Sequence, residues 1–138
     1  MKRTLINKLI ENEVTKISGW AEKIRDTKYM IFVILKDRSG SIQVSIDKAN
    51  NPSLVEKLNG VLANSVLEFE GSMVLSEYVK NGGKEFLPTE VKVLSSAAML
   101  PLDETANIDT RLDYRWIDLR SEKNNLMMKV QTTFINAM

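Results

Sequence analysis

The sequence predicts an all-β domain of five strands with one short helix between the third and fourth strands. Three observations lead to this fold class. Several segments alternate apolar and polar residues, which is typical of strands with one buried face. Glycines stand inside two of these segments, at Gly19 and Gly71, where a strand can bend or approach its neighbour closely. Turn-forming residues separate the segments, so each strand is short.

The first half of the chain is predicted to form a short amphipathic helix and three strands. Residues 4–11 space their leucines and isoleucine along one helical face. From Val14 the pattern becomes extended, and we expect a first strand that ends near Arg25. Residues 30–47 then form two strands joined by a turn at residues 37–40, Asp-Arg-Ser-Gly.

A short helix and two more strands complete the pattern. Asn-Pro-Ser opens a helix at residues 54–58, and residues 65–76 and 86–94 form the fourth and fifth strands. Pro88 limits the pairing of the fifth strand, and residues 81–83, Asn-Gly-Gly, are a strong turn signal. Five strands, a helix after the third and glycines at the bends fit a small closed barrel of the OB type. A small open sheet with one helix packed on it is the alternative.

The C-terminal part differs in character from the rest. Residues 96–120 carry a proline, several carboxylates and no regular period, which indicates a linker. Residues 121–138 are helical in composition, with Ser121 and Asn124 as a weak N-cap signal. We expect an OB domain at residues 1–95, the linker, and the first helix of another domain that continues in a longer protein. The apolar stripe of this helix consists of Leu126, Met127, Val130, Phe134 and Ile135.

Composition excludes several kinds of site. The chain has 138 residues, no cysteine and no histidine, so it lacks disulfides, thiolate metal sites and the commonest general base. No Gly-rich phosphate loop and no nucleophile beside a base occur, and we expect neither a catalytic nor a metal site. The net charge of +1 means that nucleic-acid binding would be local rather than driven by overall charge. We expect no membrane segment and a cytoplasmic location.

The second strand has an unexpected outer face. Its partner keeps this face polar, yet Phe32 lies on it. If residues 37–40 close the hairpin, Phe32 and Gln43 are diagonal neighbours. An aromatic ring can stack on an unpaired base while an amide bonds the base edge, and Arg25 can add a phosphate or base contact. The pattern alone leaves a purely structural role open, with Phe32 under a loop and Gln43 in solvent.

Two segments of the chain resemble one enzyme family. The segment 19–45, GWAEKIRDTKYMIFVILKDRSGSIQVS, resembles the N-terminal anticodon-binding domain of aspartyl-tRNA synthetases. The segment 110–134, TRLDYRWIDLRSEKNNLMMKVQTTF, resembles the part of these enzymes that connects this domain to the catalytic domain. Asparaginyl enzymes share the first motif, and lysyl enzymes share it more loosely. The two motifs together favour the aspartyl type.

The resemblance implies a role for each candidate residue. It implies that Phe32 stacks on the middle base of a tRNA anticodon and that Gln43 hydrogen-bonds this base. Arg25 would contact the anticodon loop, and Glu90 in the last strand would read the first anticodon base. The implied partner is the anticodon stem-loop of tRNA.

The implied parent enzyme attaches aspartate to tRNA with ATP and Mg²⁺ and is a homodimer. Its catalytic motifs would lie beyond residue 138, so we expect no catalysis and no cofactor in this chain. Residues 121–138 resemble the start of the motif that forms the homodimer interface. Alternatives are an asparaginyl-type domain, a stand-alone OB domain for single-stranded nucleic acid, and a protein–protein module. Residues 21–23 do not settle whether asparagine tRNA would also be used.

Overall fold

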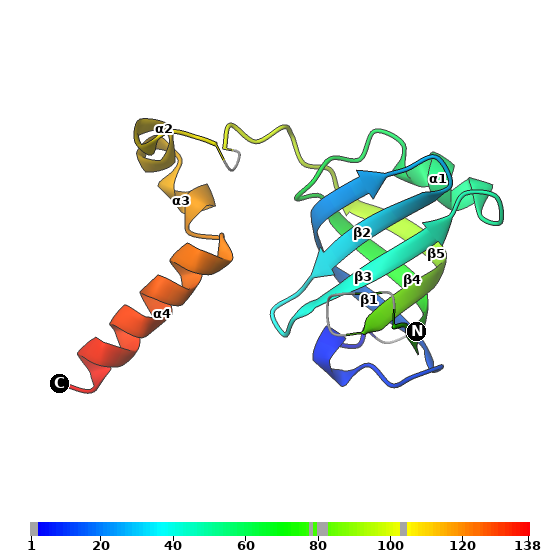
Figure 1. Cartoon of the computed structure of the whole chain (residues 1–138), viewed down its shortest axis with the longest axis horizontal. Coiled ribbons are helices and arrows are strands. Elements are labelled where there is room, and N and C mark those ends of the chain that lie inside the picture. The colour runs from blue at the N-terminus through cyan, green and yellow to red at the C-terminus, as the bar shows by residue number, and fades with distance from the viewer. Residues whose placement is uncertain (1–2, 78, 80–82, 103–104) are drawn as a thin grey trace. The chain divides into compact units, whose positions relative to one another are not determined.

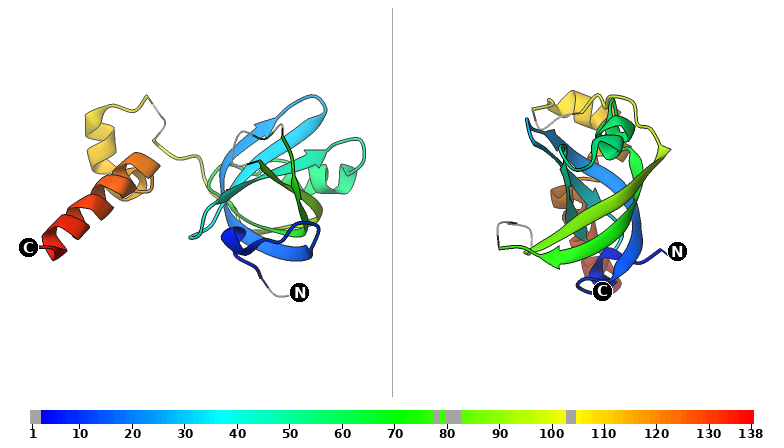
Figure 2. Two further views of the ribbon diagram at one scale, coloured as in Figure 1. Left: turned by 60° about the horizontal axis from the view of Figure 1, so that its bottom comes forward. Right: turned by 90° about the vertical axis from the view of Figure 1, so that its right-hand side faces the viewer.

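Five strands close into a barrel in the order β1-β2-β3-β5-β4 (Figures 1 and 2). The structure is a computed structural model that describes residues 3–77, 79, 83–102 and 105–138. Neighbouring strands are antiparallel except β3 and β5, which are parallel. Closure confirms the predicted barrel over the open sheet. The strands are β1 (Val14–Asp26), β2 (Met30–Lys36), β3 (Ser41–Asp47), β4 (Val66–Leu75) and β5 (Lys84–Ser95).

The interior of the barrel holds the apolar face of every strand. Alternation along β2 and β3 is the predicted one, and the side chains of Phe69 and Phe86 are fully buried between the strands. Gly19 and Gly71 lie where strands cross closely, as predicted. A Cβ at Gly19 would meet the carbonyl of Lys36, and one at Gly71 would meet the carbonyl of Leu87. Both glycines therefore permit the close strand contacts that closure requires.

One helix, α1 (Pro52–Leu58), follows β3 as predicted, with Leu54 and Leu58 buried. Its proline occupies the first turn, where no backbone N–H is needed for the helix. The predicted turn at residues 81–83 lies partly outside the described residues, which include Gly83 of that turn.

The N-terminal segment is not the helix predicted at residues 4–11. It forms one 3₁₀ turn, Ile6–Lys8. Thr4 N donates to the carbonyl of Lys16 at 2.8 Å, and Ile6 N donates to Asp37 Oδ2 at 3.0 Å. Because these donors bond to the barrel, the segment does not need the internal hydrogen bonds of a longer helix.

Residues Met99–Met138 form a compact unit of their own, apart from Met1–Ala98. Two short helices, α2 (Ile108–Asp113) and α3 (Arg115–Asp118), lie within the stretch predicted to be an irregular linker. The Asn107 side chain caps α2 by accepting a hydrogen bond from Thr110 N at 2.8 Å. The last helix, α4 (Glu122–Asn136), agrees with the prediction.

Helix α4 begins at the predicted N-cap residue, but no side-chain hydrogen bond caps it, and its predicted apolar stripe is exposed. Ser121 is the N-cap residue, but its Oγ donates backward to the carbonyl of Asp118 at 2.8 Å, and Asn124 Nδ2 donates to Asp118 Oδ2 at 2.8 Å. The side chains of the predicted apolar stripe are 46–69% exposed.

In the described part of the chain, no helix combines the length and apolar character needed to cross a membrane.

Candidate nucleic-acid interface

The outer face of four adjacent strands carries two rows of cross-strand neighbours. These rows are Arg25–Phe32–Ser45 and Lys23–Ile34–Gln43–Glu85. Phe32 stands opposite Ser45 and Gln43 stands opposite Ile34, so Phe32 and Gln43 are the diagonal neighbours that the sequence predicts. An aromatic ring, an amide, a guanidinium and a carboxylate thus meet on one face.

Phe32 is half-buried on this face, and Arg25 covers part of its ring. The Arg25 Cζ atom lies 5.6 Å from the ring centroid, a cation–π arrangement. The guanidinium is exposed, so it can move aside or cover a ligand that stacks on the ring. The pair therefore forms a platform that combines an aromatic ring with a positive charge.

Ser45 forms the floor of the site between Phe32 and Gln43. It lies on the outer face, yet it is only 3% exposed. Gln43 Nε2 donates to Ser45 Oγ at 3.3 Å, which holds the amide beside the platform. The amide has a second N–H and an acceptor oxygen, so it can donate to a ligand and accept from it. A base stacked on Phe32 would present its edge to such a group.

A β-bulge places Arg25 on this face. The β1–β2 register shifts between Ala21 and Lys23, so Glu22 is the extra residue. Before the shift, Ile17 and Ala21 point inward, and both are fully buried. After the shift, Ile24 packs against the core instead. Without the bulge, the alternation would turn Arg25 into the barrel.

The turn between β2 and β3 sets the register of the face. Asp37 Oδ1 accepts hydrogen bonds from Ser39 N at 2.6 Å, Ser39 Oγ at 2.6 Å and Gly40 N at 3.1 Å. Burial alone would raise the pKa of Asp37, but the hydrogen bonds from Ser39, Ile6 and Gly40 outweigh it and lower this pKa. The carboxylate therefore joins the hairpin turn to the N-terminal segment.

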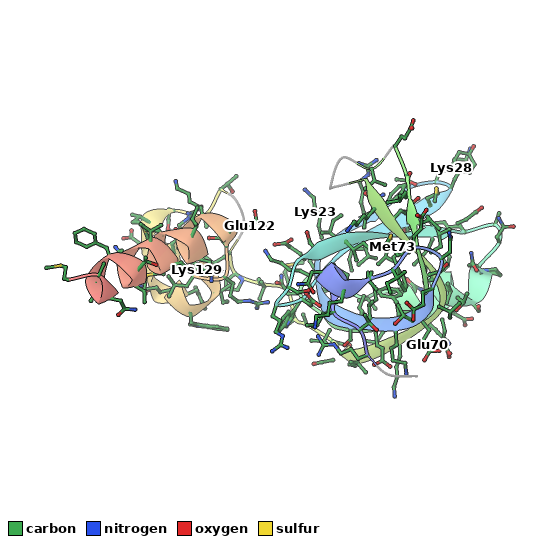
Figure 3. The ribbon with its side chains drawn as sticks, turned by 90° about the horizontal axis from the view of Figure 1, so that it is seen from below. Lys23, Lys28, Glu70, Met73, Glu122 and Lys129 are labelled. Atoms are coloured by element: carbon green, nitrogen blue, oxygen red, sulfur yellow. The ribbon has the colours of Figure 1, made fainter. Side chains whose placement is uncertain are left out.

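Glu90, the fourth predicted site residue, is an exposed residue of β5 that belongs to neither row. It stands opposite Glu70 in the β4–β5 ladder, and its Oε1 is 3.7 Å from Lys57 Nζ of α1. Glu70 in turn is 2.7 Å from Lys16 Nζ, whose hydrogen bond lowers the pKa of Glu70, and Figure 3 shows Glu70 on the outside of the barrel. The physical reason is that β5 pairs with β3 only at its first residues and then follows β4.

Glu85 is a carboxylate beside Gln43 that the sequence analysis does not single out. It is the parallel partner of Gln43, and the next residue, Phe86, points into the core. The sequence predicts a fifth strand that begins at Phe86, one residue after Glu85. Continuing the alternation one residue further back would have placed Glu85 outward, but only the parallel pairing of β3 and β5 shows that it adjoins Gln43.

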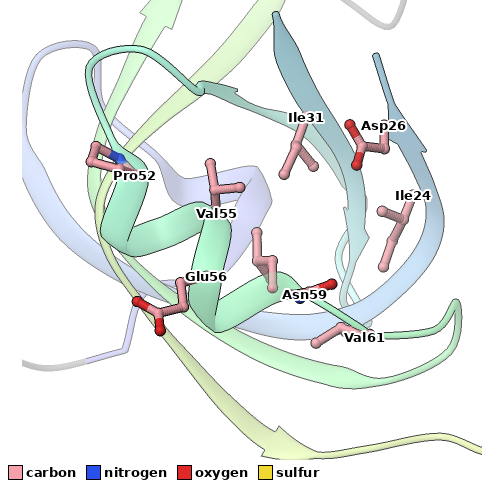
Figure 4. Close-up of a pocket in the computed structure, with 10 residues that line it drawn as sticks. Ile24, Asp26, Ile31, Pro52, Val55, Glu56, Asn59 and Val61 are labelled. Carbon is pink, nitrogen blue, oxygen red and sulfur yellow. The ribbon is translucent and has the colours of Figure 1, made fainter. Parts of the chain in front are cut away.

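A separate cavity of about 450 Å³ lies beside α1 and contains none of the predicted site residues (Figure 4). Its walls include Ile24, Ile31 and Val55, and Asp26 at its rim forms an ion pair with Lys48. Among the described residues, no three carboxylate side chains are grouped so that they could hold a metal ion. The chemistry available on the outer face is therefore stacking, hydrogen bonding and charge.

The sequence profile of the tRNA anti-codon family, described as an OB-fold nucleic acid binding domain, matches residues 15–94. The chain belongs to this family. The matched stretch of the OB-fold nucleic acid binding domain contains both rows of the outer face.

Relatives of this OB-fold domain include tRNA ligases. The chain is 35% identical over 133 residues to the aspartate–tRNA(Asp/Asn) ligase of Methanopyrus kandleri, covering 92% of this chain and 31% of that protein. It is 35% identical over 138 residues to the aspartate–tRNA(Asp) ligase of Picrophilus torridus, covering 96% and 32%. A crystal structure of asparaginyl-tRNA synthetase from Pyrococcus horikoshii matches with a TM-score of 0.80 and 26% identity, over 92% of this chain and 31% of that one. The chain spans about a third of the length of the curated relatives it matches.

Proposed function

We propose that this chain is the anticodon-binding domain of an aspartate–tRNA ligase. The observation that carries the proposal is the placement of Phe32, Gln43 and Glu85 as neighbours on the outer face of an OB-fold barrel. Membership in a nucleic acid binding family and similarity to two aspartate–tRNA ligases support tRNA as the ligand.

Each side chain of the face has one proposed role. Phe32 stacks on the middle anticodon base, an interaction worth about 1–3 kcal/mol. Gln43 hydrogen-bonds the edge of this base, and Arg25 covers the base or contacts the loop. We assign to Glu85, rather than Glu90, the reading of a neighbouring base, because a carboxylate beside Gln43 can accept hydrogen bonds from base N–H groups.

The whole ligase would carry the remaining functions. We infer that it attaches aspartate to tRNA with ATP and Mg²⁺, that it acts as a homodimer, and that it is cytoplasmic. The exposed apolar stripe of α4 supports a further packing partner for this helix, either another domain or a second subunit. The absence of cysteine fits a reducing compartment. Because the chain spans about a third of the length of the ligases it matches, we expect this chain alone to be inactive in aminoacylation.

The proposed site would accept the anticodon of aspartate tRNA and also that of asparagine tRNA. Relatives named for aspartate tRNA alone and for both aspartate and asparagine tRNA are equally identical to this chain, at 35%. The anticodons for the two amino acids share their middle base, so Phe32 and Gln43 would serve either tRNA. Discrimination would therefore depend on contacts outside this pair.

A binding titration with short anticodon stem-loop RNAs tests the proposal. The aspartate anticodon is compared with versions changed at the middle base, using the wild-type chain, Phe32→Ala and Gln43→Ala. We expect the base change and Phe32→Ala each to weaken binding by about 1–3 kcal/mol. Trp116→Ala, an exposed aromatic residue of α3 outside the barrel, is the matched control.

Two outcomes would contradict the proposal. Equal binding to all loops, unaffected by Phe32→Ala, would mean that the ring is structural. Binding that depends steeply on salt but not on the anticodon would instead indicate a general single-strand binding domain. A preference for the asparagine anticodon would keep the site and change the enzyme type.

A further inference from the structure

The β-bulge that exposes Arg25 also exposes Lys23, which takes no part in the proposed recognition of the anticodon bases. Both residues follow the register shift on β1 and are exposed, and Figure 3 shows the Lys23 side chain pointing away from the core. Lys23 is the cross-strand neighbour of Ile34, which in turn is the neighbour of Gln43. Bulges commonly redirect a side chain at a functional site. Here one extra residue places two cations on the proposed binding face.

The ammonium of Lys23 is available to a ligand. Within the part of the chain that the structure describes, no side chain forms a hydrogen bond or an ion pair with it. By contrast, the nearby Lys36 lies 3.1 Å from Glu22, and Lys16 lies within 3.3 Å of Glu68 and closer to Glu70. Lys23 is thus an unpaired cation beside a cluster of ligand-binding groups.

The segment of β1 that carries Lys23 lies beyond the end of the β1–β4 ladder. The β1–β4 ladder ends at Trp20, whereas the β1–β2 ladder continues to Asp26. In the described residues, the segment of β1 that carries Lys23 and Arg25 therefore has a strand on one side only. A nucleic-acid backbone can therefore approach the outer side of this edge without meeting another strand, while residues 59–61 and Ile24 line the cavity beside α1.

The side chains of the face match the parts of a nucleotide in order: groups for a phosphate, then for the flat face of a base, then for the edge of the base. Strand β1 presents cations, β2 presents the ring of Phe32, and β3 and β5 present the amide of Gln43 and the carboxylate of Glu85. Two strand spacings, about 10 Å, separate β1 from β3. A carboxylate repels phosphate, so a nucleotide stacked on β2 is held with its phosphate over β1 and its base edge over β3 and β5.

We propose that Lys23 binds the phosphate of the nucleotide whose base stacks on Phe32, so that the RNA backbone runs over the open edge of β1. This inference rests on the proposed function, because it needs a single-stranded RNA loop on this face. It assigns Lys23 to affinity and orientation, not to base selection.

The test is the salt dependence of binding to the aspartate anticodon stem-loop between 50 and 200 mM KCl. Each phosphate contact to a single strand contributes about 0.7 to the slope of log K against log salt. We expect Lys23→Gln to reduce the slope by about 0.7, which makes the loss of affinity over this range about 2.6-fold smaller than for the wild type. Lys23→Arg should restore the wild-type slope, and selectivity for the middle base should not change in either variant.

Lys92→Gln is the matched control, since Lys92 is an exposed lysine of β5 opposite Glu68. Its slope should equal that of the wild type. An unchanged slope in Lys23→Gln, or a change in its base selectivity, overturns the phosphate contact while leaving the proposed function intact. Failure of the wild-type chain to distinguish anticodons, with no effect of Phe32→Ala, overturns the proposed function and the Lys23 assignment with it. Circular dichroism of each variant verifies that the barrel is folded.

Discussion

Replacing Asp37 by asparagine should destabilise the barrel without changing its shape. The carboxylate is 5% exposed, and its two oxygens have different tasks. Oδ1 accepts from the turn donors of Ser39 and Gly40, whereas Oδ2 accepts from Ile6 N at 3.0 Å. An asparagine can keep its oxygen toward the turn, but its NH₂ group then faces the N–H of Ile6.

The size of the stability loss follows from the one hydrogen bond that asparagine cannot make, the bond to the N–H of Ile6. A buried donor left without an acceptor costs about 1–3 kcal/mol, and hydrogen bonds to a neutral oxygen are weaker than those to a carboxylate. We expect Asp37→Asn to lower the free energy of unfolding by about 1–3 kcal/mol at neutral pH. Urea denaturation followed by circular dichroism measures this loss. Asp113→Asn, an exposed aspartate of α2, is the control and should be close to neutral.

The dependence on pH gives a second, independent signature. The folded protein lowers the pKa of Asp37, so the stability contributed by this carboxylate is present above its unfolded pKa of about 3.9. It is lost as the pH falls from there through the folded pKa. The stability difference between the wild type and Asp37→Asn should therefore shrink on acidification. A difference that stays constant down to about pH 3, or that is absent at neutral pH, would refute the reasoning.

Three further predictions concern the site and the closure of the barrel. Phe32→Ala should weaken anticodon-loop binding by about 1–3 kcal/mol with little effect on thermal unfolding, and an unchanged titration would remove the ring from the site. Glu85→Gln should alter selectivity at one anticodon base, whereas Glu90→Gln should not; the opposite result in stem-loop titrations would return the assignment to Glu90. Gly71→Ala should lower the free energy of unfolding by about 1–3 kcal/mol, because the new Cβ meets the carbonyl of Leu87, and a melting temperature equal to that of the wild type would contradict this contact.

The sequence predicts those features of the site that depend on residues close to one another along the chain. Alternation and the Asp-Arg-Ser-Gly turn fix the β2–β3 register, and this register makes Phe32 and Gln43 neighbours. The two strands are adjacent in the chain, so no long-range pairing has to be known. A period of two residues is enough to identify an apolar ring on a polar face.

The features that sequence does not predict come from irregular or long-range pairing. The bulge after Ala21 changes the inward phase of β1, and its sequence signal is weak: Ile24 follows Ala21 by three residues rather than two or four. The neighbour of Gln43 on β5 is set by a parallel contact between strands that are far apart in the sequence. The N-terminal helix was overpredicted because the pattern cannot show that Asp37 accepts the hydrogen bond of Ile6.

Closure of the barrel therefore buries the core and also places Glu85 beside Gln43. An open sheet in which β3 formed an edge would still bring Phe32 and Gln43 together, but Glu85 would be absent. The parallel contact of β3 with the start of β5 supplies that carboxylate, and the same strand carries Glu90 away along β4. A variant that loosens this contact while β2 and β3 remain paired should retain stacking on Phe32 and lose selectivity at the base that Glu85 reads. In Gly71→Ala the new Cβ would meet the carbonyl of Leu87, which directly follows the β3–β5 contact at Glu85 and Phe86. Separate measurement of affinity and base selectivity in this variant would show whether the site depends on closure in this way.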